Sequence, residues 1–334
     1  MLGELAAKAA GQCIYAYVGE QLKKLRVKSL RDLSTRKLKE IINTAFQKAH
    51  DSVIASYVQA PSEYSFPVPG FPVQGRVKPQ AVFNLSTIEG GVMVYTSPKT
   101  GLRLVEFGTT VSLALVEPRA GFVVVAHVGD SDVVVGSVDD SGFVTANDMT
   151  KTHSAFSMSE RFRIAELLSA GDDEDSVNLR DDGYLEVLEL GGLPSSVALG
   201  MTRAIGHKWL EEYGVIPRPD IKCYDISEED AVLVLATDGV WDAMHPRDCC
   251  LFVLQRLLAE GQSVDQVARD LCQSCVFMQE KAVGAADNTS AVIIRLDARS
   301  QAGKDRERSV KGGSVFLSLG GRGERSVVSG AAGI

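Results

Sequence analysis

The sequence predicts an α+β domain, and three observations carry that prediction. Apolar residues recur at helical spacing over the first fifty residues, short β-rich apolar runs follow from Thr109, and helical spacing returns after Ala236. Strands and helices that are grouped along the chain, rather than strictly alternating, are typical of α+β folds. We therefore expect sheets with helices packed outside them.

Two packed helices are expected at the start of the chain. Ile14, Val18 and Leu22 fall four residues apart, with polar residues between them. A second helix is expected to begin near Ser34 or Thr35, because either side chain can accept a backbone N–H as an N-cap. Its apolar stripe continues to Val53.

The β-rich part of the chain is expected to hold five main strands and three further helices. The first two strands are expected to form a hairpin through the turn near Pro118–Gly121. One helix is expected at Ser157–Ala170, and two more are expected after Ala236, the second of them from Ser263 onward. The strands are expected at Thr110–Val116, Phe122–Val128, Asp132–Val138, Ala231–Ala236 and Thr289–Leu296.

Two segments depart from this regular pattern. Residues 60–104 are expected to be an insertion or loop, because prolines and glycines interrupt residues 60–79, with short strands only near 91–95 and 102–107. From Arg299 the composition shifts to Gly, Ser and Arg, so residues 298–334 are expected to be a disordered tail. The domain itself is expected to span residues 1–297.

Composition excludes several classes of protein. The 334 residues are 45% hydrophobic and 23% charged, which is the balance of a globular protein. The net charge of −8 argues against a general nucleic-acid binder. No apolar run reaches the roughly 18–20 residues needed to span a bilayer. Six cysteines are too few for a disulfide scaffold. We therefore expect a monomer in the cytoplasm or nucleus, without nucleic acid or membrane as a partner.

Three aspartates stand at the ends of expected strands. Asp130 and Asp238 each follow a strand, and Asp287 precedes the last one. Each pattern taken alone is typical of a turn or a cap, although the string Thr237–Asp242 is more specific than Asp-Gly alone. Carboxylates from separate strand ends can converge on a hard divalent cation, which requires oxygen ligands. A metal site is therefore one interpretation of the three.

Two other clusters have plainer explanations. The acidic segment Asp172–Asp182 could bind calcium, but a solvated loop is favoured because the spacing of an EF-hand is absent. Cys272 and Cys275 lie three residues apart on an expected helix. Buried thiols are favoured there, because a zinc site needs a second pair at suitable spacing.

Seven segments, taken in order, resemble the motifs of metal-dependent PPM-type (type 2C) serine/threonine protein phosphatases. The resemblance runs over about residues 1–297, and seven motifs in the same order are far more specific than any one of them. The segments are Phe107–Thr110, His127–Ser131, Glu160–Ile164, Leu199–Gly206, Val215–Ile221, Asp238–Asp242 and Asp287–Thr289.

The resemblance implies a fold, a cofactor and an activity. The fold is a four-layer α-β-β-α sandwich of two antiparallel sheets with outer helices. The cofactor is a pair of Mg²⁺ or Mn²⁺ ions between the sheets, with a weaker third ion. By motif, Asp238 and Asp287 match ligands of the pair, and Asp130 matches a ligand of the third ion. The activity is hydrolysis of phosphoserine and phosphothreonine in protein substrates.

The departures from the family pattern open a second hypothesis. The strings Arg-x-x-Met-Glu-Asp and Asp-Gly-His-Gly-Gly, which supply the family's phosphate-binding Arg, bridging Asp and acid His, do not occur in the sequence. The expected sandwich is therefore N-terminally incomplete, with a sheet edge exposed, and no catalytic residue is assigned. The alternative to a phosphatase is a catalytically inactive pseudophosphatase that binds phosphoproteins or regulates a partner.

Overall fold

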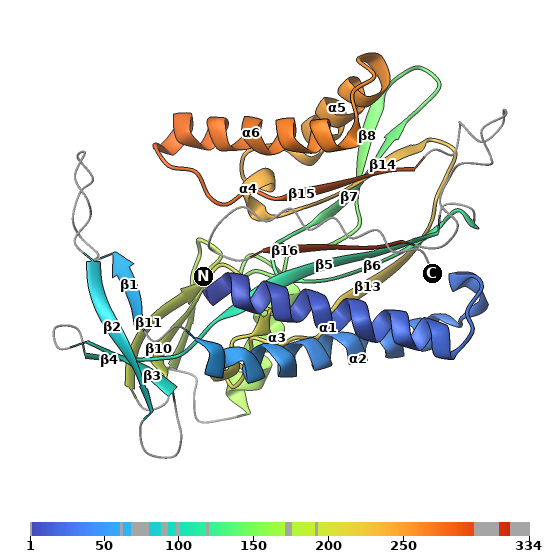
Figure 1. Cartoon of the computed structure of the whole chain (residues 1–334). Helices are drawn as coiled ribbons and strands as arrows, with labels where there is room; N and C mark the ends of the chain where they lie inside the picture. Colours follow the sequence, from blue (N-terminus) through green and yellow to red (C-terminus); the bar gives the residue numbers. More distant parts are fainter. Residues whose placement is uncertain are drawn as a thin grey trace.

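Two antiparallel sheets form the centre of the computed structural model (Figure 1). The first has the strand order β12-β5-β6-β13, with β16 also paired to β5, and the second has the order β15-β14-β7-β8. The structure describes residues 2–60, 63–67, 80–87, 93–97, 101–117, 120–170, 176–190, 193–296 and 314–320.

The strands of both sheets lie close to the positions that the sequence predicts. The first sheet contains β5 (Gly108–Glu117), β6 (Phe122–Val128), β12 (Ile205–Gly206), β13 (Asp220–Asp225) and β16 (Ser314–Gly320). The second contains β7 (Val133–Val138), β8 (Val144–Asp148), β14 (Asp230–Ala236) and β15 (Ala291–Arg295).

The central strands are apolar along most of their length because both of their faces are covered. In β5, Leu113 belongs to the core beneath the first two helices, whereas its neighbour Ala114 belongs to the core between the sheets. Successive residues of a strand point to opposite faces. A strand placed between two cores is therefore apolar at most positions on both faces, as the valine runs of β6 and β7 are.

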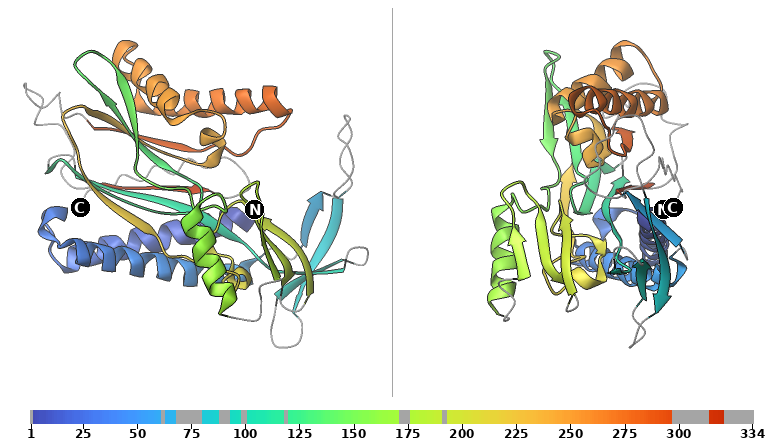
Figure 2. Two further views of the ribbon diagram at one scale, coloured as in Figure 1. Left: turned by 180° about the vertical axis from the view of Figure 1, so that it is seen from behind. Right: turned by 90° about the vertical axis from the view of Figure 1, so that its left-hand side faces the viewer.

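Helices cover the outer face of each sheet, as the two views in Figure 2 show. The first sheet is covered by α1 (Leu2–Lys24) and α2 (Thr35–Ala55), which bury Ile14 and Phe46 completely. The second is covered by α4 (Asp238–Trp241), α5 (Pro246–Leu254), the π-helical turn η7 (Gln255–Ala259) and α6 (Val264–Val283). The α-β-β-α sandwich predicted from the motifs is confirmed.

The predicted helix starts are confirmed by their caps. The Ser34 hydroxyl accepts a hydrogen bond from the Lys37 backbone N–H, so Ser34 rather than Thr35 is the N-cap of α2. The Ser263 hydroxyl accepts in the same way from Gln266 N–H at the start of α6. Short 3-10 turns also lie between the larger elements: η1 (Leu30–Asp32), η2 (Ser56–Gln59) and η6 (Lys208–Leu210).

Two smaller sheets lie beside the sandwich. Residues 60–104, expected to be mainly a loop, contain an antiparallel sheet of β1 (Glu63–Pro67), β2 (Gln80–Thr87), β3 (Met93–Ser97) and β4 (Gly101–Leu104). The other is β9 (Val177–Leu179), β10 (Leu185–Leu190) and β11 (Leu193–Leu199), and it packs with α3 (Met158–Ser169) around a separate core. The expected loop at 68–79 lies outside the described residues.

One edge of the first sheet is completed by a late segment of the chain. The sequence predicted an exposed sheet edge without naming its strand, and the edge of β5 at Thr110–Val116 pairs with β16. The structure therefore places Ser314–Gly320 in a strand, although the whole tail was expected to be disordered. The other tail residues, 298–313 and 321–334, lie outside the described residues.

The core between the sheets offers a direct test of the sandwich. Leu233 of β14 has no exposed surface and lies between the two sheets. We expect Leu233→Ala to lower the free energy of unfolding by about 2–5 kcal/mol, because it removes buried methyl groups and leaves a cavity. Urea unfolding measures the loss. Leu258→Ala at a half-exposed position is the matched control, and equal losses in both variants would contradict this packing.

Candidate functional site

Asp130 lies in the turn between β6 and β7, where the chain passes from the first sheet to the second. Gly129 precedes it with a φ of +104°, a backbone conformation that favours glycine. A Cβ atom at Gly129 would lie 2.2 Å from the Thr110 side chain of β5. The hydroxyls of Thr110 and Ser131 are 2.7 Å apart, so Thr110 contacts the turn on both sides of Asp130.

The structure brings the segments around Asp238 and Asp287 into contact. Asp238 opens α4 directly after β14, and a Cβ atom on the next residue, Gly239, would lie 2.7 Å from the Asn288 carbonyl oxygen. Gln279 of α6 joins the two segments: its amide nitrogen donates to Gly239 O (2.9 Å), and its amide oxygen accepts from Asp287 N–H (2.7 Å). The Asp238-Gly239 turn therefore packs against the residues that follow Asp287.

Negative charge accumulates at this end of the sheets. Burial, and then the neighbouring carboxylates of Asp238, Asp132 and Asp242, raise the pKa of Asp130 to about 7. Desolvation and then the charge of Asp287 raise the pKa of Asp242. Asp130 therefore interacts electrostatically with Asp238, whereas Asp287 interacts with Asp242, the residue that also influences Asp130. A cation in this region would relieve the repulsion.

The carboxylate oxygens of the three aspartates suit a hard divalent cation, but the structure does not group enough ligand side chains among the described residues to form a complete metal site. Carboxylate oxygens are the ligands that Mg²⁺ and Mn²⁺ prefer. Within the part of the chain that the structure describes, no three His, Cys, Asp or Glu side chains are grouped closely enough to hold a metal ion. Asp130, Asp238 and Asp287 thus resemble part of a metal site.

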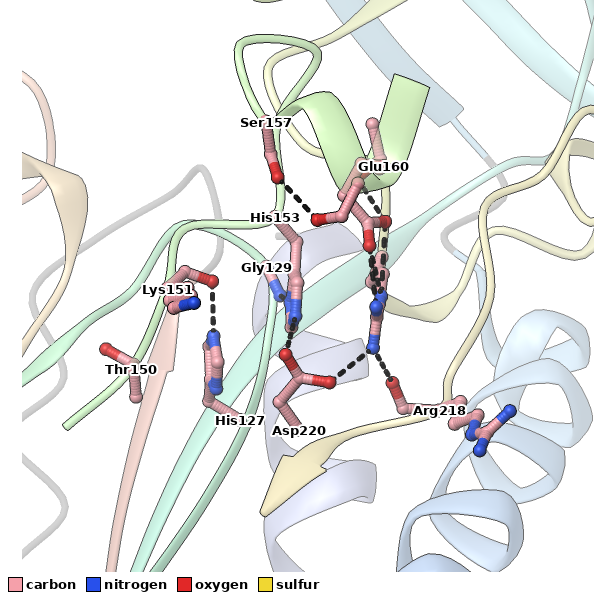
Figure 3. A network of polar contacts seen from close by, with 12 residues as sticks. His127, Gly129, Thr150, Lys151, His153, Ser157, Glu160, Arg218 and Asp220 are labelled. Atoms are coloured by element: carbon pink, nitrogen blue, oxygen red, sulfur yellow. Dashed lines mark hydrogen bonds and ion pairs between the residues drawn. The ribbon is translucent and has the colours of Figure 1, made fainter. Parts of the chain in front are cut away.

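A buried ion-pair network lies beside the Asp130 turn (Figure 3). At its centre is Glu160 of α3, whose side chain is only 2% exposed. Its carboxylate accepts hydrogen bonds from Arg163 (2.7 Å), Arg203 (2.6 Å) and the Thr202 hydroxyl (2.9 Å). Burial alone would raise the pKa of Glu160, but the two arginines outweigh it and lower the pKa to about 2. Glu160 is therefore charged in the folded protein.

The network continues from Arg203 to the turn itself. Arg203 Nη1 donates to Asp220 Oδ1 of β13 (2.9 Å), and Asp220 Oδ2 lies 3.3 Å from His153 Nε2. His153 then forms two hydrogen bonds with Gly129. The Nδ1 atom of its ring accepts from the Gly129 backbone N–H (3.2 Å), and the backbone N–H of His153 donates to the Gly129 carbonyl oxygen (2.9 Å). The Glu160–Arg163 ion pair on α3 is thus connected, through Arg203, Asp220 and His153, to Gly129, the residue before Asp130.

Two histidine rings stack next to this connection. His127 and His153 have ring centroids 4.3 Å apart and an angle of 7° between ring planes. Burial, and then the neighbouring His153, lower the pKa of His127 to about 4. His127 Nε2 lies 2.9 Å from the Lys151 carbonyl oxygen, so this nitrogen carries the proton of a neutral ring. His127 is thus a structural histidine at neutral pH.

Sequence reasoning identified the network's motifs but not its connections. Glu160 and Arg163 are three apart on a helix, which is a spacing that predicts an ion pair. Nothing in the sequence indicates that Asp220 meets His153, because this contact joins a strand to a distant loop. The four cysteines Cys249, Cys250, Cys272 and Cys275 are free thiols, and burial raises the pKa of each, as expected for structural cysteines.

Comparison with known proteins identifies the family. The family model for protein phosphatase 2C matches residues 70–284, which is more than half of the sequence, and the chain belongs to this family. The crystal structure of serine-threonine phosphatase 2C from Toxoplasma gondii superimposes with a TM-score of 0.56 and 18% identity. That superposition covers 87% of this chain and 80% of the other, and it supports the fold.

Curated plant proteins show how far the similarity extends. Probable protein phosphatase 2C 33 of Arabidopsis thaliana is 31% identical over 195 residues, which cover 57% of this chain and 37% of that protein. Protein phosphatase 2C 50 of Oryza sativa subsp. japonica is 24% identical over 319 residues, which cover 90% of this chain and 68% of that protein. The chain spans 27–37% of the length of three of the relatives that it matches. None of its described helices is both long and apolar enough to cross a membrane.

Glu160→Gln tests the network through pH. We expect the variant to lose on the order of 3 kcal/mol of stability at neutral pH, because it removes the charged partner of Arg163 and one of the two carboxylate partners of Arg203. A pKa that folding lowers stabilises the protein above the unfolded value of about 4.5, and this contribution disappears as the pH falls toward about 2. The difference between variant and parent should therefore shrink over that range in denaturant unfolding.

A second substitution on the same helix controls for this measurement. Glu166 is exposed, so Glu166→Gln should change stability little at any pH. A loss in Glu160→Gln that stays constant from about pH 6 to about pH 2.5 would show that the charge of Glu160 does not stabilise the fold.

Proposed function

We propose that this chain contributes to a serine/threonine protein phosphatase that hydrolyses phosphomonoesters with a dinuclear Mg²⁺ or Mn²⁺ centre. The observation that carries the proposal is the set of three strand-end aspartates. Gln279 joins the backbone of Gly239, the residue after Asp238, to that of Asp287. The charge of Asp238 raises the pKa of Asp130, and that of Asp287 raises the pKa of Asp242. Family membership supports the same reaction class.

The three aspartates would bind different metal ions. Asp238 and Asp287 would bind the ion pair, and Asp130 would bind a weaker third ion, as their motifs imply. Bound divalent ions lower the pKa of water and offset the negative charge of a phosphoryl group. Without them, the charge on Asp130, Asp238 and Asp242 would repel a phosphate, so cation binding and substrate binding should depend on each other.

The proposed substrates are phosphoserine and phosphothreonine side chains of proteins. The protein is proposed to act as a monomer in the cytoplasm or nucleus, with no nucleic acid or membrane as a partner. The names of the relatives, which are all protein phosphatases, support the substrate class.

A second candidate is a phosphoprotein-binding pseudophosphatase without hydrolytic activity. Two observations favour it. The string Asp-Gly-His-Gly-Gly is absent from the sequence, and the described residues contain no group of three metal donors. A ligand that bridges both ions is required for two-metal hydrolysis.

One comparison of proteins separates the two candidates. We expect the 334-residue chain to hydrolyse p-nitrophenyl phosphate near the background rate in Mn²⁺. The same chain preceded by a relative's segment with Arg-x-x-Met-Glu-Asp and Asp-Gly-His-Gly-Gly should gain Mn²⁺-dependent activity. Asp238→Asn in that longer protein should abolish the gain, because it removes a charged ligand, whereas Asp181→Asn in an exposed loop should retain it.

Two outcomes would change this assignment. If the longer protein is folded but inactive at saturating Mn²⁺, the pseudophosphatase is the better description. If the 334-residue chain alone is fully active, another carboxylate completes the metal site and the roles given to the three aspartates are wrong.

A further inference from the structure

The two edges of β5 are filled by very different segments. One edge pairs with β6, the next strand along the chain, over Val111–Glu117. The other edge carries β12 at Gly108 and Thr109, and β16 from Thr110 to Val116. Figure 1 shows β16 running alongside β5. This second edge is therefore completed by the last strand that the structure describes.

An unpaired edge at this position would be costly. β5 is buried from Thr109 to Val116, with only its two end residues partly exposed. A buried backbone N–H or C=O without a partner costs about as much as a lost hydrogen bond. A long apolar edge is also a template on which another strand can add. The fold thus requires an occupant along most of this edge.

The sequence of β16 matches the edge residue by residue. Val315, Leu317 and Leu319 stand opposite Leu115, Leu113 and Val111 of β5. The three β5 residues all belong to the core beneath α1 and α2. Directly opposite residues of an antiparallel pair share one face, and a slip by one residue would exchange the faces. Apolar residues thus occupy the three positions of β16 that stand opposite these β5 residues, and Phe316 between them stands opposite Ala114.

The far end of the pairing lies beside the Asp130 turn. Ser318 and Gly320 stand opposite Ser112 and Thr110. Ser112 donates a hydrogen bond to the Ser131 carbonyl oxygen, and the Thr110 and Ser131 hydroxyls are bonded to each other. The edge of β5 and the candidate metal region therefore share the same supporting residues.

We propose that the edge of β5 at Thr110–Val116 is a binding site for an extended peptide segment, and that Ser314–Gly320 is its tethered occupant. The site takes a segment with apolar residues at every second position and binds it as an added antiparallel strand, mainly through backbone hydrogen bonds. It does not depend on whether the protein hydrolyses phosphate.

Cutting the chain between β15 and β16 tests whether the strand is a ligand. A site-specific protease sequence replaces residues 302–308 of the full chain, and the cut protein is passed over a size-exclusion column. We expect the C-terminal piece to elute with the body of the protein. Leu317→Pro should release it, because proline has no backbone N–H and breaks the pairing.

The same piece contains a matched control. Val327→Pro lies outside β16, so it should leave the C-terminal piece bound. Separation of the unsubstituted pieces, or equal retention of the two proline variants, would overturn the proposal. Elution of the uncut protein as a dimer that Leu317→Pro converts to a monomer would assign the strand to a second copy and overturn the pairing within one chain.

A peptide tests whether the edge accepts a segment that is not tethered. A labelled peptide of residues 312–322 should bind saturably to the full-length Leu317→Pro chain, with at least tenfold weaker binding to the unsubstituted chain, whose edge is filled. Equal binding to both, or no binding to a Leu317→Pro chain with the circular dichroism of the parent, would overturn the proposal. If Leu317→Pro unfolds, retention of the unsubstituted piece after cutting decides the question.

Discussion

The face-to-face packing of the two sheets is the constraint on which the rest of the structure depends. Strands β5, β6, β7 and β14 have a core on each side, so almost every residue along them is apolar. Charged side chains can then stand only where a strand ends. Asp130 and Asp238 follow strands in different sheets, and Asp287 precedes a third strand. Burial, and then the charge of Asp238, raise the pKa of Asp130.

The second structural requirement is a fully paired buried charge. Glu160 is tolerated at 2% exposure because two arginines and a threonine hydroxyl satisfy its carboxylate. A buried ion pair of this kind costs desolvation energy, but it fixes the relative positions of the side chains that it joins. Here the chain of contacts continues from Arg203 through Asp220 and His153 to the backbone of Gly129. The network links α3, β13 and the loop before α3 to the turn that holds Asp130.

The sequence predicted the parts of this structure that depend on local pattern. Apolar runs located β5, β6, β7, β14 and β15 to within a few residues, and Ser34 and Ser263 marked helix starts because capping is a local interaction. The motif order also predicted the sandwich. In the sheet at residues 60–104, β3 and β4 lie close to the two short strands that were predicted. Strands β1 and β2 were missed because the prolines suggested a loop, although Pro67 stands only at the last residue of β1. The strand β16 and the Asp220–His153 contact depend on distant partners, which one sequence does not reveal. The metal-binding role of Asp130, Asp238 and Asp287 stays a prediction.

The central claim is that these three aspartates form one cation-binding region. Paramagnetic broadening of backbone NMR signals by Mn²⁺ tests it most directly, because broadening falls steeply with distance from the ion. We expect the signals of Asp130, Gly239 and Asn288 to broaden together, at a lower Mn²⁺ concentration than those of the exposed acidic residues Asp181 and Asp182. Broadening of the three at clearly different concentrations, or of the exposed loop first, would contradict a shared site.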